Sequence, residues 1–220
     1  MSEQGNTASK VLPEQQVGAV QSKPQGVWET IKSLALLVVV ALMLRGTVIE
    51  AFKIPSSSME PTLQIGDHIF VNKLSYGLRL LGVTDMLYRW GSPARGDIVV
   101  FTRPDDPATP EDEAETNLIK RVIGLPGDRL EVRGTVVMIN DQVYSEDSRY
   151  SRWVLGGSTS CGPVTIPEGR VILLGDNRDQ SRDSRFWHDP FLPIERIKGR
   201  AFFIWWNSQF HFRRMFSVLR

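Results

Sequence analysis

A strongly apolar block near the N-terminus constrains this chain more than any other feature of its sequence. Every residue from Leu34 to Leu44 is apolar, and the wider window Ile31–Ile49 holds few polar residues. As a helix this window would be roughly 28 Å long, close to the thickness of the hydrocarbon core of a bilayer. Lys32 and Arg45 lie near its ends, where long side chains can reach the lipid headgroups.

Three interpretations of the apolar block compete. A cleavable signal peptide needs a small-residue cleavage site after the block, and residues 45–52 offer none. A helix buried in a protein core stays open, but a Leu/Val run without a polar face suits lipid better. We therefore expect a transmembrane anchor over residues 27–50, between a disordered tail at 1–26 and a folded domain at 51–220. The positive charges on its two sides are too balanced to set its orientation.

The overall composition excludes several classes of protein. Apolar residues make up 41% of the 220 residues and charged residues 23%, so the chain can bury a core and is not disordered throughout. Lys and Arg number 26 against 25 Asp and Glu, which lacks the basic excess of a nucleic-acid-binding protein. Cys161 is the single cysteine, so neither an intramolecular disulfide nor a cysteine-rich zinc site is available.

The sequence after residue 51 predicts a β-rich domain. Short runs of β-branched and aromatic residues alternate with turn residues, and Asn140-Asp141 has the position of a tight hairpin turn. Residues 103–116 are acidic and proline-rich, which indicates a solvated loop. We expect strands over 68–71, 97–102, 118–123, 135–139, 171–174 and 200–206.

One segment with catalytic potential follows the apolar block. Three serines and a methionine lie between Pro55 and Pro61. Such a segment can be no more than a rigid polar linker. The prolines also restrict the backbone, however, and a nucleophile needs restriction to hold an attack geometry. A serine is unreactive near neutral pH without a base, so this segment requires a partner from elsewhere in the chain.

Lys120 is the candidate base. Whichever face of the strand at 118–123 turns inward, a cation lies among aliphatic side chains. The strand can simply be an edge whose charge reaches solvent. Alternatively the lysine is kept partly dry, which lowers its pKa because burial penalises the charged form. A fall to a pKa of about 7–8 corresponds to roughly 4 kcal/mol. The neighbouring Arg121 cannot serve, since arginine does not deprotonate in proteins.

A third segment, residues 175–185, concentrates hydroxyls, carboxylates and arginines in a predicted turn. On its own it is typical of a solvated hairpin, and it lacks the spacing of a calcium loop. It is also suited to orient a catalytic group. The histidines offer no alternative, because His68, His188 and His211 fit neither a Gly-x-Ser-x-Gly triad nor a metal-binding pattern. We interpret all three as structural or surface residues.

Taken together, four ordered segments resemble the motifs of bacterial type I signal peptidases. These are membrane-bound serine proteases that remove signal peptides from exported proteins, and the resemblance covers roughly residues 28–206. The family fold it implies is mainly β, with antiparallel sheets in an extended, barrel-like core after an N-terminal transmembrane helix. The four segments are 55–63, 95–101, 119–128 and 175–185.

The resemblance also implies roles for individual residues. Ser58 matches the nucleophile and Lys120 the general base of a Ser/Lys dyad without histidine. Ser56 would donate its hydroxyl to the oxyanion hole beside the Ser58 N–H, and Ser181 would hydrogen-bond and orient Lys120. Structural support is expected from Asp176, Asp183 and Arg185. Shallow pockets for small substrate residues are expected from Phe52, Ile54, Leu63, Leu118 and Ile119.

The family's setting completes these expectations. The implied partners are preproteins that carry signal peptides and membrane lipid, with a monomeric enzyme, no nucleic acid, no cofactor and no metal. The enzyme would cross the bacterial cytoplasmic membrane once and hold its catalytic domain on the extracytoplasmic side. Three features depart from the family: a single visible N-terminal span where some members have two, a long acidic loop at 103–116, and a Cys161 without the partner that forms a disulfide in some members.

Two other classes of protein were weighed against this one. A self-cleaving repressor also uses a Ser/Lys dyad, but it needs an internal cleavage loop and a DNA-binding domain where this chain has an apolar block. A membrane-tethered β-domain without catalytic activity would lack a reactive serine at Ser58.

Overall fold

The computed structural model describes residues 26–78, 87–102, 117–145, 151–152 and 160–219. The expected tail at 1–26 therefore lies almost wholly outside the described residues, and the expected acidic loop at 103–116 lies entirely outside them. The chain divides into two compact units, Met1–Val39 and Val40–Arg220. The second unit holds the strands and the candidate site.

One α-helix occurs in the described part of the chain, α1 (Val27–Thr47). Leu34, Leu36 and Leu37 on this helix are exposed. None of the described helices combines the length and apolar character that a membrane crossing requires. The helix ends before β1 (Ile49–Lys53), so the last two residues of the expected anchor segment lie in a strand instead. Cross-strand pairing of Ile49 with Asn72 fixes this boundary, and β-branched residues favour it.

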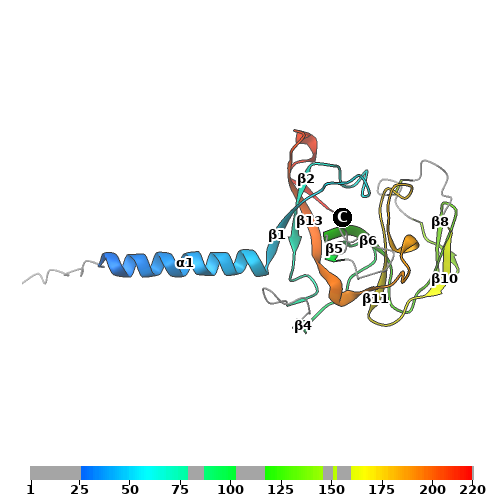
Figure 1. Ribbon diagram of the computed structural model, residues 1–220, viewed down its shortest axis with the longest axis horizontal. Coiled ribbons are helices and arrows are strands. Elements are labelled where there is room, and N and C mark those ends of the chain that lie inside the picture. Colours follow the sequence, from blue (N-terminus) through cyan, green and yellow to red (C-terminus); the bar gives the residue numbers. More distant parts are fainter. Residues whose placement is uncertain (1–25, 79–86, 103–116, 146–150, 153–159, 220) are drawn as a thin grey trace, which may run out of the picture. The chain divides into compact units, whose positions relative to one another are not determined.

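An eight-stranded antiparallel sheet organises the second unit (Figure 1). Its order is β1-β2-β13-β5-β6-β11-β12, and β14 pairs with β13. In the described residues the path ends at β1 and β12, so the sheet is open and the expected barrel-like closure is not found. Its remaining strands are β2 (Asp67–Asn72), β5 (Ile98–Thr102), β6 (Asn117–Gly124), β11 (Arg170–Leu174), β12 (Leu192–Pro193), β13 (Ile197–Asn207) and β14 (Ser217–Val218).

Two smaller sheets complete the unit. A four-stranded sheet has the order β10-β7-β8-β9, with the expected tight turn at Asn140-Asp141. Both turn residues have positive φ, which Asn and Asp tolerate better than most residues. The strands are β7 (Arg129–Arg133), β8 (Val136–Ile139), β9 (Gln142–Val143) and β10 (Cys161–Thr165), and the pair β3 (Gly77–Leu78) and β4 (Tyr88–Arg89) forms the third sheet. Short 3-10 turns are η2 (Ser184–Phe186), η3 (Ile194–Arg196) and η4 (Phe212–Arg214).

All six strands expected from the sequence are present within one to three residues of their predicted ends. The unexpected strands are at most five residues long, so even the alternation of charged and apolar residues in β7 covers too few positions to be distinctive.

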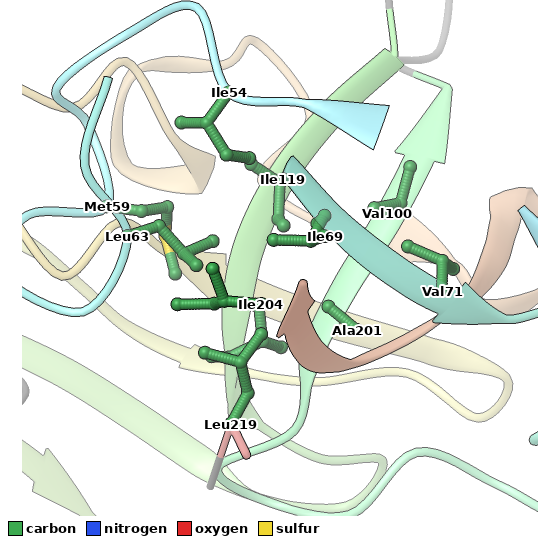
Figure 2. Packing of buried hydrophobic residues seen from close by; sticks show 11 residues of the cluster. Ile54, Met59, Leu63, Ile69, Val71, Val100, Ile119, Ala201, Ile204 and Leu219 are labelled. Carbon is green, nitrogen blue, oxygen red and sulfur yellow. The ribbon is translucent and has the colours of Figure 1, made fainter. Parts of the chain in front are cut away.

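Three hydrophobic clusters form the core. The first contains Met59 and Leu63, which flank the serine segment, together with Ile69 on β2 and Ile204 on β13 (Figure 2). Leu219, near the C-terminus, belongs to the same cluster. The serine segment is therefore packed onto the main sheet through its apolar side chains and is not a free linker.

Candidate active site

Ser58 lies in the turn between β1 and β2 and is 9% exposed. The fully buried side chain of Met59 holds the turn directly after it. A backbone bond from Leu63 N to Met59 O, at 2.8 Å, closes the following helical turn. The Ser58 carbonyl accepts a hydrogen bond from Asn177 N at 3.1 Å. Apolar packing and backbone hydrogen bonds thus fix the serine within a rigid segment.

Lys120 lies on β6, between β5 and β11, and only 4% of it is exposed. Its Nζ donates to Ser58 Oγ at 2.8 Å and to the Ile119 carbonyl at 3.0 Å. The structure therefore brings together the two residues that the sequence singles out as nucleophile and base, from positions 62 residues apart. The serine hydroxyl is within direct proton-transfer distance of the amine.

Burial changes the protonation of this amine. It lowers the pKa of Lys120 from 10.5 to about 8, because an ammonium ion is poorly solvated among apolar groups. The carboxylates of Asp183 and Asp176 oppose this effect by stabilising the charged form. The result is an amine that is neutral in a sizeable fraction near pH 8 and can accept the serine proton.

Ser56 and Ser181, the two serines expected to assist the reaction, differ in their contacts. Ser56 Oγ lies 3.3 Å from Ser58 Oγ, so its hydroxyl is next to the reacting oxygen. Ser181 is buried, and its hydroxyl has no hydrogen-bond partner. The expected bond from Ser181 to Lys120 is therefore not made. Ser181 packs against Gly175, where a Cβ would lie 2.2 Å from its Oγ.

Asp176 links the serine turn to the strand that carries Lys120. Its carboxylate accepts a forked pair of hydrogen bonds from Arg121, at 2.8 and 2.7 Å, and one from Thr62 Oγ1. Arg121 also donates to the Gly96 carbonyl at 2.7 Å. Both charged partners are buried, and a buried carboxylate of this kind needs such pairing to remain ionised.

Asp183 performs a similar role on the turn after β11. One of its carboxylate oxygens accepts from Gly175 N at 2.9 Å, and the other accepts from Arg185 Nε at 2.8 Å. Arg185 also donates to the Arg178 carbonyl at 2.7 Å. This network joins the two ends of residues 175–185 to each other, while Asp176 connects the segment to Arg121 and Thr62.

A small, shallow recess opens between β1, β5 and β6. Its lining includes four of the five expected pocket residues, Phe52, Ile54, Leu118 and Ile119. The other residues that line it are Lys53, Pro55, Ile69, Val100 and Asn117. Leu63 is not among them. Its side chain is fully buried in the first hydrophobic cluster together with Met59, and the pocket role expected for it stays a prediction.

Three contributors to this site were not identified from the sequence. Thr62 and Asn177 act through hydrogen bonds across more than a hundred residues of chain, which no local pattern reveals. Arg121 was considered only as an unsuitable base. Its position beside Lys120 in an apolar strand was the one available signal, because a buried arginine requires a carboxylate partner.

The geometry defines the site of a hydrolase, with a serine hydroxyl held by a buried amine beside an open recess. Comparisons with known proteins identify which hydrolase. The family model described as "Signal peptidase, peptidase S26" matches residues 27–206. The chain is 36% identical to a signal peptidase I of Leptolyngbya laminosa over 94% of this chain and 93% of that protein. It is 38% identical to a probable signal peptidase I-2 of Synechocystis over 84% and 77%, and 36% identical to a signal peptidase I of Pseudomonas fluorescens over 79% and 70%.

The chain belongs to the signal peptidase family, peptidase family S26. It is a serine peptidase that cleaves signal peptides, and its substrates are preproteins that carry them. This result excludes the self-cleaving repressor and the tethered domain without catalytic activity that were weighed from the sequence.

Proposed function

We propose that this peptidase uses Ser58 as its nucleophile and neutral Lys120 as its general base. The observation that carries the proposal is the 2.8 Å contact between Lys120 Nζ and Ser58 Oγ in a nearly buried setting. Ser58 Oγ attacks the scissile carbonyl carbon while its proton moves to Lys120. The resulting ammonium then donates that proton to the leaving amine as the C–N bond breaks. Water, deprotonated by Lys120, hydrolyses the ester and releases the signal peptide.

The oxyanion that forms during this attack needs hydrogen-bond donors. The Ser58 N–H and the Ser56 hydroxyl are the groups proposed here, because Ser56 Oγ already lies beside the reacting oxygen. A donor of this kind typically contributes about 10²–10³ in rate.

The proposed substrate specificity follows from the recess. Apolar side chains of Phe52, Ile54, Leu118 and Ile119 face a hollow that is too shallow for large side chains. We propose cleavage after small residues, with the substrate chain lying along β1 and β6.

The proposed location is the cytoplasmic membrane, crossed once by α1, with the catalytic domain on the extracytoplasmic side. Exposed apolar side chains along α1 support this, since a soluble surface seldom carries them in such density. The residues after β13 add the exposed aromatic side chains of Phe210, Phe212 and Phe216, which interfacial segments commonly carry. Membrane lipid would then be a partner, and a monomer would suffice because one chain supplies the whole site.

Three variants of the full chain in detergent test this mechanism on a labelled preprotein. Ser58→Ala and Lys120→Met should each lose nearly all cleavage, because each removes one member of the dyad. Ser57→Ala is the matched control and should cleave like wild type, since Ser57 Oγ makes only a weak 3.5 Å contact with Gln180. Lys120→Met should fold at least as stably as wild type near pH 6, where burying the charged amine costs up to about 3 kcal/mol.

Two results would contradict the proposed roles of Lys120 and Ser58. Substantial cleavage by a folded Lys120→Met enzyme would place the base elsewhere. Full activity of Ser58→Ala would exclude Ser58 as the nucleophile.

A further inference from the structure

The last residues of the described chain pack beneath the catalytic turn, beyond the end of the family match at residue 206. After β13 the chain turns back through η4, and β14 pairs with β13, with Val218 opposite Phe203. Leu219 N donates to the Phe202 carbonyl at 2.9 Å. The Leu219 side chain enters the cluster that also contains Met59 and Leu63 (Figure 2). This C-terminal segment, residues 208–219, therefore contacts the same core that supports Ser58.

Arg214 connects the C-terminal segment directly to the serine turn. The Nη2 atom of Arg214 donates to the Thr62 carbonyl oxygen at 2.7 Å and to Asp67 Oδ2 at 2.6 Å. Thr62 lies four residues after Ser58, in the helical turn that begins at Met59. Asp67 is fully buried and starts β2. One guanidinium thus holds both the middle and the end of the segment that leads from the nucleophile into the sheet.

Asp67 is itself held from two further directions. It accepts from Gln64 N at 2.8 Å and from Asn207 Nδ2 at 2.7 Å. The carboxylate is therefore fixed, and Arg214 makes a short, forked contact with it that a flexible surface arginine would not maintain. The Arg214 side chain is only 20% exposed.

Thr62 is held on its opposite side by the strand of the base. Its Oγ1 donates to Asp176, whose carboxylate is paired with Arg121, the residue next to Lys120. The main-chain carbonyl of Thr62 contacts the C-terminal segment, and its side chain is tied to β6 through Asp176. A shift of Thr62 would therefore alter the position of Ser58 relative to Lys120.

We propose that Arg214 is a positioning residue for the nucleophile, which fixes the Thr62 carbonyl and so keeps Ser58 Oγ within reach of Lys120 Nζ. The inference rests on the proposed roles of Ser58 and Lys120. Arg214 touches neither the substrate nor the reacting atoms. A misplacement of about 1 Å at a reacting group can cost about 10²-fold in rate, so a modest loosening of this turn is expected to be measurable.

The test compares three variants of the full chain in detergent. Arg214→Ala removes both contacts. Arg214→Lys keeps a positive charge opposite Asp67 but lacks the planar fork that reaches the carbonyl and the carboxylate together. Arg213→Ala is the matched control, because Arg213 is an exposed neighbour of the same charge. Each variant is measured for its melting temperature, for kcat and KM on a preprotein, and for the rate at which a serine-directed acylating inhibitor labels Ser58.

We expect Arg214→Ala to lower kcat and the labelling rate by about 10- to 100-fold, with KM changed by no more than about twofold. Its pH–rate profile should shift to higher pH, because a loosened turn admits water to the Lys120 ammonium. Arg214→Lys should melt near the wild-type temperature and recover only part of kcat. Arg213→Ala should match wild type in every measurement.

Wild-type labelling and an unchanged pH profile in folded Arg214→Ala would overturn the inference. If Arg214→Ala does not fold, Arg214→Lys decides: wild-type kcat at a wild-type melting temperature would overturn it, and a reduced kcat would support it. If the inhibitor does not label Ser58 in the wild-type enzyme, the proposed nucleophile and this inference both fail. If it labels wild type and all variants at the same rate, only the role of Arg214 is overturned.

Discussion

At the scale of single residues, the chemistry depends on one amine that is kept nearly dry. Lys120 is buried in the main sheet, and the effect of this burial outweighs the opposing influence of Asp183 and Asp176 on its pKa. An exposed lysine would be charged throughout the physiological range and unable to take a proton. The site therefore needs a lysine at this position and a packed sheet around it.

The pH dependence of cleavage should follow this amine. Because neutral Lys120 is the active form, kcat/KM should rise about tenfold per pH unit below a pKa near 8 and level off above it. The measurement is kcat/KM for wild type on a preprotein between pH 6 and 10. A profile that is flat over this range, or one that turns near the usual pKa of histidine, would contradict the assignment of Lys120 as the base.

At the scale of elements, the active site is the junction of two turns and one strand. The turn after β1 carries Ser58, β6 carries Lys120, and the turn after β11 lies against both through Asp176 and Asn177. The two turns approach each other most closely at Gly175. A Cβ at this position would lie 2.5 Å from the Ser58 carbonyl oxygen and 2.4 Å from Ser181 Cβ.

Replacing this glycine should therefore disable the enzyme. Gly175→Ala places a methyl group against the backbone of Ser58, which cannot move without leaving Lys120. We expect kcat to fall by about 10²-fold and the free energy of unfolding to drop by about 1–3 kcal/mol. Preprotein cleavage and chemical denaturation measure the two effects.

A matched control and a second variant separate the causes. Gly91→Ala should behave like wild type, because the nearest atom to its Cβ is the Ser75 carbonyl oxygen at an ordinary 3.5 Å. Gly175→Ala combined with Ser181→Gly removes the contacts with the Ser181 side chain but leaves the 2.5 Å approach to the Ser58 carbonyl oxygen, so this double variant should stay impaired. Recovery of full activity in the double variant would show that Ser181, and not Ser58, takes up the strain.

At the scale of the whole molecule, a β-rich peptidase unit follows a helix whose side chains are apolar and exposed. Leu34, Leu36 and Leu37 are exposed on α1, and exposed apolar side chains at this density are the observation behind the proposed membrane anchor. In that proposal the preprotein substrates are also held at the membrane. An anchored enzyme and its substrate would then meet on one surface.

The proposed anchor can be tested by adding charge to α1. Leu36→Asp with Leu37→Asp in the full chain should move the protein from the membrane fraction to the soluble fraction, because each acid in the centre of a span costs about 2.5–3.5 kcal/mol. Thr30→Asp, outside the apolar block of the same helix, is the control and should remain in the membrane fraction. Retention of the doubly charged variant after a carbonate wash would argue against α1 as the anchor.

The sequence by itself determined the elements and the chemical candidates. Runs of β-branched residues specify strands locally, and Asn140-Asp141 specifies its turn through backbone preferences that need no tertiary contact. Lys120 was singled out as the candidate base from its position among aliphatic residues, whereas Ser58 was distinguished from its neighbouring serines by the resemblance to the signal peptidase motif. Strands such as β1 and β7, of five residues each, escaped prediction because so short a pattern is not distinctive.

Only the tertiary structure decided how these candidates meet. Lys120 reaches Ser58 across 62 residues, Thr62 reaches Asp176 across 114, and Arg214 reaches Thr62 across 152. The low pKa of Lys120 also exists only in the fold, since it arises from the burial of the amine in the folded chain. The burial of Leu63 and Ser181 was likewise decided by the fold, because what packs against a side chain is not contained in the local sequence.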